Sequence, residues 1–442
     1  MEREVLLLAC VAYFKSHQGF DNVFKKMKEK YKSLGKMGGT IVITYLSEAE
    51  KEALTGFLRK DYSRQKSASI SLEKFQKALA YTRFDGLCLE DILKKYFEEE
   101  ITSNKDERER FLEKRKQFFQ GCIQFFKGTI AGKWLEDVME KQYNAYPFLM
   151  KKYNNNKKQL RQHIEDVANA FNHLPCFFQD AKGIAVFASQ ITKNPHAFDA
   201  GTDCGMLLQY AIMYELGENK PQNAEEKAEI YYRVGILVDE ISNYTICCGL
   251  RAITAGKRHA GWQGFYEASE SMQVSLKNLS TVESIMSPVG KVFVVENPAV
   301  FSSILDKLSG KPVPLVCTYG QVKLASLILL DKLAVAGTDI YYSGDFDPEG
   351  LMIADKLKTR YKERLILWRY TIADYQAVIS REKITPNRIK KLNHLKDKQL
   401  KKIAEALTKE GYAGYQELLV DALVQSIQLN KPWRRDIESL RK

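Results

Sequence analysis

From about residue 270 onward, short β-branched runs alternate with helical runs, and this alternation limits the possible fold more than any other feature. Four runs have the composition of buried strands: KVFVVE (291–296), PLVCT (314–318), TDIYYSGD (338–345) and RLILWRY (364–370). Helical patterns fill the intervals between them, at residues 298–308, 321–337 and 348–361. Strands that alternate with helices form βαβ units, so this part of the chain is expected to fold as a parallel sheet covered by helices.

Acidic residues stand at the ends of two of these expected strands. Glu296 closes the first strand, and Asp345 and Asp347 follow the third. Residues two apart on extended backbone point to the same side, so Asp345 and Asp347 can face one site while Phe346 packs inward. Ligands of open parallel sheets bind outside the carboxyl ends of the strands. We therefore expect these three acids to share one site.

Three carboxylates that converge on one point repel one another unless a cation neutralises them. Oxygen-only ligands favour Mg²⁺ or Mn²⁺, and Mg²⁺ keeps coordination positions for water and phosphate. Asp347 stands where a helix N-cap belongs, with Pro348 at the first helical position. Gly350 leaves room for close approach, and Glu349 is a possible additional ligand. The pattern indicates a divalent-cation site suited to phosphodiester chemistry.

The chain before residue 270 has mostly helical patterns. The β-branched run at 40–46 predicts a strand, and Ser47 with Glu50 predicts a capping box at the start of the next helix. Charge-rich amphipathic patterns at 104–119 and 151–171 are typical of helices that pack as arms or bundles. We therefore predict an α+β multidomain protein with three parts: a mainly helical N-terminal arm domain (1–175), a central helical, winged-helix-like region (176–268) and a C-terminal α/β domain (269–442).

Charge and cysteine usage narrow the class of partner. Lys and Arg exceed Asp and Glu by 67 to 55, a formal net charge of +12 that favours an anionic partner, nucleic acid before a membrane surface. The eight cysteines form no C-x-x-C pair, and with the six scattered histidines they offer no zinc-ligand spacing. Reduced thiols and the lack of a signal-peptide or membrane-span pattern predict a cytoplasmic protein without a membrane partner.

The run RAITAGKRHAGWQG (251–264) is basic and rich in glycine. We expect it to be a flexible loop at a domain boundary. Its Arg251, Lys257 and Arg258 are candidate contacts for nucleic-acid phosphates, although a solvated loop explains the same residues.

Two motifs together resemble the Toprim signature, which is a glutamate on one strand and D-x-D on a later strand. VVENPAVF (294–301) and GDFDPEG (344–350) carry the resemblance, and the first is most similar to the topoisomerase VI A subunit and its relatives, with Phe301 five residues after the glutamate. Those relatives often have a basic residue where this chain has Asn297, so no role of that residue is carried over. The resemblance implies that Glu296, Asp345 and Asp347 bind metal, with Glu349 at an optional third-acid position.

A second resemblance covers most of the chain. The stretches GGTIVITYLSEAEKEALTGFL (38–58), PHAFDAGT (195–202), GILVDEISNYTICCGL (235–250), PLVCTYGQ (314–321) and YYSGDFDPEGLMIA (341–354) resemble the bacterial DUF2399 family, the JetD- or MksG-like nuclease subunits of Wadjet plasmid-defence systems. That family implies a Toprim nuclease, usually a homodimer with N-terminal arms. It cuts double-stranded plasmid DNA presented by an SMC-like ATPase with its kleisin-type partners. Gln321 lies in a family-like patch, which suggests a role in substrate positioning.

Three functional hypotheses follow. The first is a Mg²⁺- or Mn²⁺-dependent DNA endonuclease that hydrolyses phosphodiesters at Glu296, Asp345 and Asp347. The second is tyrosine-based DNA breakage as in topoisomerase VI, for which Tyr244 and Tyr266 are possible nucleophiles. The third is a non-catalytic DNA-binding subunit in which the acids bind a structural cation.

Overall fold

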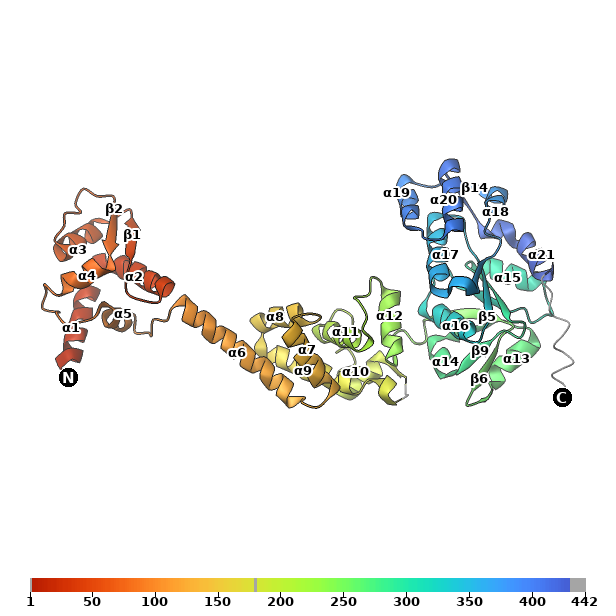
Figure 1. The fold of residues 1–442 in the computed structure, drawn as a ribbon, viewed down its shortest axis with the longest axis horizontal. Coiled ribbons are helices and arrows are strands. Elements are labelled where there is room, and N and C mark those ends of the chain that lie inside the picture. The colour runs from red at the N-terminus through yellow and green to blue at the C-terminus, as the bar shows by residue number, and fades with distance from the viewer. Residues whose placement is uncertain (1, 179–180, 430–442) are drawn as a thin grey trace. The chain divides into compact units, whose positions relative to one another are not determined.

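A two-stranded antiparallel sheet, β1 (Thr40–Thr44) with β2 (Ser67–Ser71), organises the N-terminal part of the chain. The computed structural model describes residues 2–178 and 181–429, and the chain divides into two units, Met1–Phe125 and Phe126–Lys442. We describe each unit separately; the first is coloured red to orange in Figure 1.

The first unit has its own apolar core. Ile41 and Ile43 alternate with exposed residues along β1, as expected for a strand with one buried face. The sheet packs with five helices: α1 (Glu2–Ser16), α2 (Asp21–Leu34), α3 (Glu48–Leu58), α4 (Leu72–Leu79) and α5 (Leu89–Phe97). The predicted capping box is confirmed, because the Ser47 hydroxyl accepts from the Glu50 N–H and the Glu50 carboxylate accepts from the Ser47 N–H. Helix α6 (Asn104–Phe125) buries few of its residues, as the charge-rich pattern predicted.

The second unit begins with a group of helices. They are α7 (Ile130–Lys141), α8 (Tyr146–Asn155), α9 (Lys157–Asn172), α10 (Ile184–Thr192), α11 (Asp203–Leu216) and α12 (Ala224–Arg233). Helix α9 packs along α11, and a short parallel pair joins β3 (Lys182–Gly183) to β4 (Ile236–Leu237). The chain therefore divides differently from the prediction, because the expected boundary at 175/176 falls inside this packed group.

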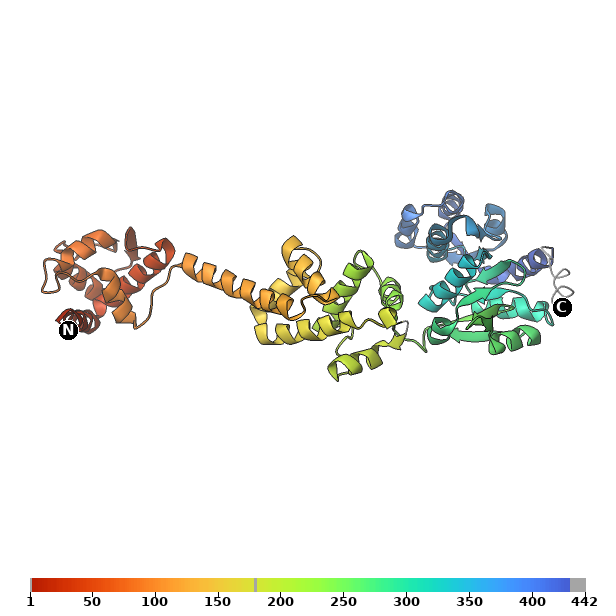
Figure 2. The ribbon, with the colours of Figure 1, turned by 60° about the horizontal axis from the view of Figure 1, so that its bottom comes forward.

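A six-stranded sheet forms the centre of the second unit, green to blue in Figures 1 and 2. In spatial order its strands are β13 (Leu365–Leu367), β12 (Asp339–Ser343), β10 (Lys291–Val295), β11 (Leu315–Cys317), β5 (Tyr244–Cys248) and β8 (Met272–Ser275). The first four are parallel, as predicted, and β5 and β8 add an antiparallel edge. The expected domain boundary at 268/269 also shifts, because β5 precedes it and yet belongs to this sheet.

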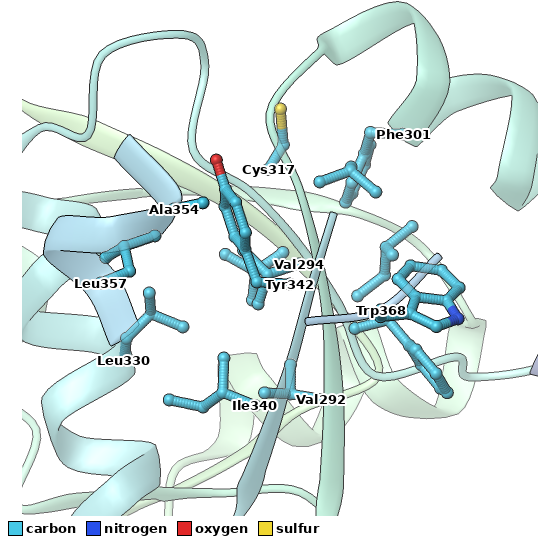
Figure 3. Close-up of a cluster of buried hydrophobic side chains, with 14 of the residues drawn as sticks. Val292, Val294, Phe301, Cys317, Leu330, Ile340, Tyr342, Ala354, Leu357 and Trp368 are labelled. Atoms are coloured by element: carbon cyan, nitrogen blue, oxygen red, sulfur yellow. The ribbon is translucent and has the colours of Figure 1, made fainter. Parts of the chain in front are cut away.

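Helices cover both faces of this sheet. Helices α16 (Leu324–Val335) and α17 (Pro348–Tyr361) lie on one side, and α15 (Pro298–Lys307) with α21 (Val420–Leu429) lies on the other (Figure 1). Successive strand residues alternate between these faces, which makes the strand runs apolar throughout. Figure 3 shows part of the resulting core: Val292, Val294, Phe301, Cys317, Leu330, Ile340, Tyr342, Ala354, Leu357 and Trp368.

The run 251–264 is not the flexible loop that its composition predicted. It forms β6 (Arg251–Thr254), β7 (Lys257–Arg258) and the start of α13 (Ala260–Ala268), and β6 also pairs with β9 (Ser284–Met286). Ala255 and Gly256 both have positive φ, 50° and 68°, and connect the strands as a two-residue hairpin turn. The glycine thus marks a tight turn and not a mobile segment.

The chain after β13 closes one end of the sheet. It contains α18 (Ile372–Ala377), β14 (Ile379–Lys383), α19 (Pro386–Ile389), α20 (Lys398–Glu410) and β15 (Tyr412–Gly414). One further helix of this unit, α14 (Leu276–Thr281), lies between β8 and β9 in the chain. Strands β14 and β15 pair, and the backbone of Phe346 exchanges two hydrogen bonds with Gly414. Within residues 2–178 and 181–429, none of the helices combines the length and apolar character of a membrane span.

Phe346 anchors this closure and gives the first prediction. Its fully buried ring stacks on Tyr370 at 4.8 Å between centroids and also contacts Tyr375. Phe346→Ala should lower the free energy of unfolding by about 3–5 kcal/mol, because it leaves a cavity in a packed core. Urea denaturation of the full chain measures this change, and the control Phe346→Leu should lose clearly less. Equal stability of the Ala variant and the wild type would contradict the packing described.

Candidate active site

The predicted acids lie at the switch point of the parallel sheet. The chain leaves β10 through α15 toward β11 on one side, and it leaves β12 through α17 toward β13 on the other. Adjacent parallel strands with opposite exits leave a crevice at their carboxyl ends, where open α/β sheets bind ligands. Glu296 follows β10 directly, and Asp345 and Asp347 follow β12. The two strands are paired in register up to Val295 and Ser343, so the acids come together as expected.

Glu296 is half-buried, and no basic side chain within the described residues pairs with its carboxylate. Burial, and then the neighbouring charge of Asp345, raises its pKa to about 8. Its Oε2 accepts a long hydrogen bond from the Asp345 N–H at 3.4 Å. The Tyr342 hydroxyl is buried beside this carboxylate without a hydrogen bond of good geometry. A Cβ on Gly344 would come within 2.8 Å of Glu296 Oε2, so a larger residue there would force the carboxylate to move.

Asp345 is held by backbone from a distant part of the chain. Its Oδ1 accepts from the Gln416 N–H at 2.8 Å, and its own carbonyl accepts from the Tyr370 hydroxyl at 2.6 Å. Burial raises the pKa of Asp345 to about 6; the Gln416 hydrogen bond opposes this rise, and the charges of Glu417 and Asp347 add to it. Asp345 is thus oriented by the fold but remains short of positive charge.

Asp347 has the structural role that the sequence predicted. It is the N-cap of α17, with Pro348 at the first helical position, and its Oδ1 accepts from the Gly350 N–H at 2.7 Å. A Cβ at Gly350 would come within 2.4 Å of the Asp345 carbonyl oxygen. Gly350 therefore allows the first turn of α17 to approach the loop that carries the acids. Burial raises the pKa of Asp347, and Gly350 and Arg388 counteract this.

Two basic residues that sequence reasoning missed complete the site. Arg388, in α19, donates to Asp347 Oδ2 at 2.5 Å and to Glu349 Oε2 at 2.6 Å, and Lys391 donates to Glu349 Oε1 at 2.7 Å. Burial alone would raise the pKa of Glu349, but these hydrogen bonds lower it to about 2. No local motif marks Arg388 or Lys391, because they lie about 40 residues after the acids and meet them only through the tertiary fold.

A cavity of about 650 Å³ opens beside the acids and contains Gln321 in its wall. Glu296, Glu349 and Lys391 also line it, so Gln321 shares this cavity with two of the four predicted acids. The wall further includes apolar residues of α17, Met352 and Ile353. The opening is large enough for part of a substrate to approach the acidic edge.

Arg251, Lys257 and Arg258 are not brought to this site. Strand β5 runs antiparallel to β11, so its last residue, Cys248, pairs with Leu315 at the beginning of β11. The β6–β7 hairpin follows β5 in the chain and therefore begins at the edge of the sheet opposite to Glu296. Lys257 and Arg258 are exposed, whereas the Arg251 guanidinium lies 4.2 Å from the centroid of the Tyr266 ring.

The two candidate tyrosine nucleophiles occupy different places. Tyr244 begins β5 and so lies at the same edge of the sheet as the acids, next to Tyr319. Tyr266 lies in α13 and packs under Arg251, near the opposite edge. Neither of them belongs to a helix-turn-helix element as the structure describes it.

The atoms of the three acids are of the type that binds a hard divalent cation, but their positions do not form a cation site. Glu296, Asp345 and Asp347 offer only oxygen, and the buried Tyr342 hydroxyl and Gln416 amide nitrogen beside them have no hydrogen-bond partner. However, no group of three or more His, Cys, Asp or Glu side chains within the described residues is arranged to hold a metal ion. Instead, the two carboxylate oxygens of Asp347 accept from Arg388 and from the Gly350 N–H.

The raised pKa of Glu296 predicts a pH-dependent stability. Its pKa is 4.5 ordinarily and about 8 when folded, so the folded state keeps a proton that the unfolded chain has lost between these values. Stability should therefore fall as pH rises from 4.5 to 8. Glu296→Gln should reduce this fall, leaving the part below about pH 6 that the raised pKa of Asp345 contributes, and should melt at least about 3 °C above wild type at pH 9.

Thermal melts from pH 5 to pH 9 measure this difference. The matched control is Glu363→Gln at an exposed position, which should follow the wild-type curve. Mg²⁺ or Mn²⁺ added at pH 9 should stabilise the wild type and not Glu296→Gln, since only the wild type retains the carboxylate. Parallel pH curves for wild type and Glu296→Gln would refute the assigned charge state.

Two family models match the chain, one in its N-terminal part and one in its C-terminal part. Residues 37–252 match the family described as "Protein of unknown function N-terminus (DUF3323)", and residues 272–427 match "Protein of unknown function C-terminus (DUF2399)". No curated protein matches the chain. The second match spans the acids and Arg388, so the whole candidate site except β5 lies within it. The N-terminal part of the chain thus matches the DUF3323 model and the C-terminal part the DUF2399 model, consistent with the DUF2399 family that its motifs resemble.

Proposed function

We propose that this protein is a divalent-metal-dependent DNA endonuclease of the Toprim type. The observation that carries the proposal is the meeting of Glu296, Asp345 and Asp347 at the switch point between β10 and β12. Phosphodiester hydrolysis needs a site that neutralises phosphate and activates water, and clustered acids at such an edge are suited to hold the cation for it. The resemblance of the two motifs to the Toprim signature supports the same reading.

Glu296, Asp345 and Asp347 would hold Mg²⁺ or Mn²⁺, with Glu349 as a further candidate. When bound, such a cation polarises the scissile phosphate and lowers the pKa of water. In the hydrolysis, a water molecule loses one proton as its oxygen bonds to phosphorus, one P–O ester bond breaks, and the leaving oxygen takes up a proton.

Two basic side chains of the protein have a separate role in this proposal. Arg388 pairs with Asp347 and Glu349, and Lys391 pairs with Glu349. In the proposal, these guanidinium and ammonium groups would meet a DNA phosphate that approaches the acids. Arginine matches phosphate geometry with two parallel donors. Arg388 therefore orients the carboxylates before substrate binds and can turn to the phosphate when Asp347 engages the cation.

The biological partners are inferred from the family resemblance. We propose that the chain acts as a homodimer and as the nuclease subunit of an SMC-type plasmid-defence complex. An SMC-like ATPase with kleisin-type partners would present double-stranded plasmid DNA. The formal charge of +12 supports a polyanionic substrate.

Plasmid cleavage tests the proposed function. Purified protein, alone and with its SMC partners, is incubated with supercoiled plasmid in Mg²⁺, Mn²⁺ or EDTA. Asp345→Asn should reduce the cleavage rate more than about 100-fold, because loss of a metal ligand exceeds the 10–100-fold typical of a supporting residue. The matched control is Asp339→Asn, at the amino end of the same strand, which should cleave like wild type.

The same reactions separate the alternatives. Protein covalently attached to DNA after denaturation would indicate a tyrosine nucleophile, with Tyr244 as the residue at the correct edge. Equal cleavage by wild type and Asp345→Asn would reject the acidic site. Metal-dependent stabilisation without cleavage, even with the SMC partners present, would favour the non-catalytic alternative.

A further inference from the structure

Two aromatic rings and a lysine lie at the same edge of the sheet as the acids. The Tyr319 and Tyr244 rings are 6.1 Å apart between centroids at an interplanar angle of 65°. Lys323 Nζ lies 4.6 Å from the centroid of Tyr244 and 5.5 Å from that of Tyr319. We name Tyr244, Tyr319 and Lys323 the aromatic platform.

Backbone hydrogen bonds fix the platform directly to the carboxyl end of β10. Tyr319 and Gly320 follow β11, and the Gly320 N–H donates to the Glu296 carbonyl at 3.1 Å. Tyr244 reaches this edge because β5 is antiparallel to β11. The platform therefore borders Glu296 on the β11 side, and Arg388 borders the acids on the α17 side.

Tyr319 is held in a conformation that packing alone does not require. Its φ is 62°, in the left-handed region that bulky residues rarely adopt, and Gly320 follows with φ 76°. Tyr319 remains 44% exposed, so burial of its side chain contributes little free energy to offset the unfavourable backbone conformation. The exposed ring is therefore available for contact with a ligand.

We propose that the aromatic platform binds an unpaired base of the DNA strand whose phosphodiester lies at Glu296 and Asp345. The proposal rests on the proposed function and specifies its substrate. Tyrosine faces stack on bases of any sequence, and a neighbouring lysine pairs with the strand's phosphate. Bases inside an intact duplex do not offer a free face, so the site selects DNA that is locally melted, gapped or frayed.

Binding without cleavage tests the platform independently of catalysis. Full-length protein is titrated in EDTA with fluorescent DNA carrying a central single-stranded gap, and with the uninterrupted duplex of equal length. A 2-aminopurine in the gap reports stacking by loss of its fluorescence. Wild type should bind the gapped DNA more tightly than the duplex and quench the probe.

The variants separate the ring from the backbone. Tyr319→Asn keeps a residue that tolerates positive φ and removes the ring, and it should weaken gapped-DNA binding about 5- to 100-fold with little effect on duplex. Tyr319→Phe should retain wild-type binding. Tyr45→Asn is the matched control, because Tyr45 also has positive φ (61°) and is 90% exposed, in the first unit.

Lys323→Gln should reduce the salt dependence of binding by about one phosphate contact.

The outcomes distinguish the two proposals. Equal binding of gapped DNA by wild type and Tyr319→Asn, or no preference over duplex, would overturn the platform even if plasmid is cleaved. A gap preference that depends on Tyr319, in a protein that cleaves nothing, would support the platform as a DNA-binding site and reject the nuclease.

Discussion

The in-register pairing of β10 with β12 is the constraint on which the rest of the site depends. Lys291 pairs with Asp339 at one end and Val295 with Ser343 at the other, so both strands end at the same level. Their next residues are then Glu296 and the Gly344–Asp345 turn. The pairing is stabilised by buried apolar side chains on both faces, whose burial contributes far more than the acids cost. The core therefore supplies the stability that lets carboxylates stand close together.

Electrostatics divides the four acids into two classes. Glu296 and Asp345 have raised pKa values because of burial and of neighbouring carboxylates, and the hydrogen bonds that oppose this rise come mainly from backbone N–H groups. Glu349 has a lowered pKa because Arg388 and Lys391 donate to it. Asp347 lies between these classes, with the helix terminus on one oxygen and Arg388 on the other. In the proposed function, Glu296 and Asp345 are therefore the acids with the least neutralisation from basic side chains, and a divalent cation would supply it.

Local pattern was sufficient for much of this fold. Helix α17 occupies the predicted residues 348–361, and Asp347 caps it as expected, because proline, glycine and the acid act within one turn. The parallel core strands were also predictable from their apolar runs. The antiparallel strand β5 was not, since its place depends on a partner about 70 residues later. Because β5 is antiparallel to β11, Arg251, Lys257 and Arg258 lie at the edge of the sheet opposite to the acids, and Tyr244 lies at the same edge as the acids. Arg388 and Lys391 escaped prediction for the same reason, because their significance comes from contact and not from spacing.

The support of Asp345 by Gln416 also sets an order of assembly during synthesis. Strands β10 to β13 leave the ribosome well before residue 416, so the acidic loop at first lacks the N–H that holds Asp345 and the β15 backbone that pairs with Phe346. Domains generally fold as units during synthesis, the N-terminal one first. The acidic edge of this sheet is complete only once Gln416 and β15 have reached it. A nascent or C-terminally clipped molecule would have the scaffold without a finished acidic edge.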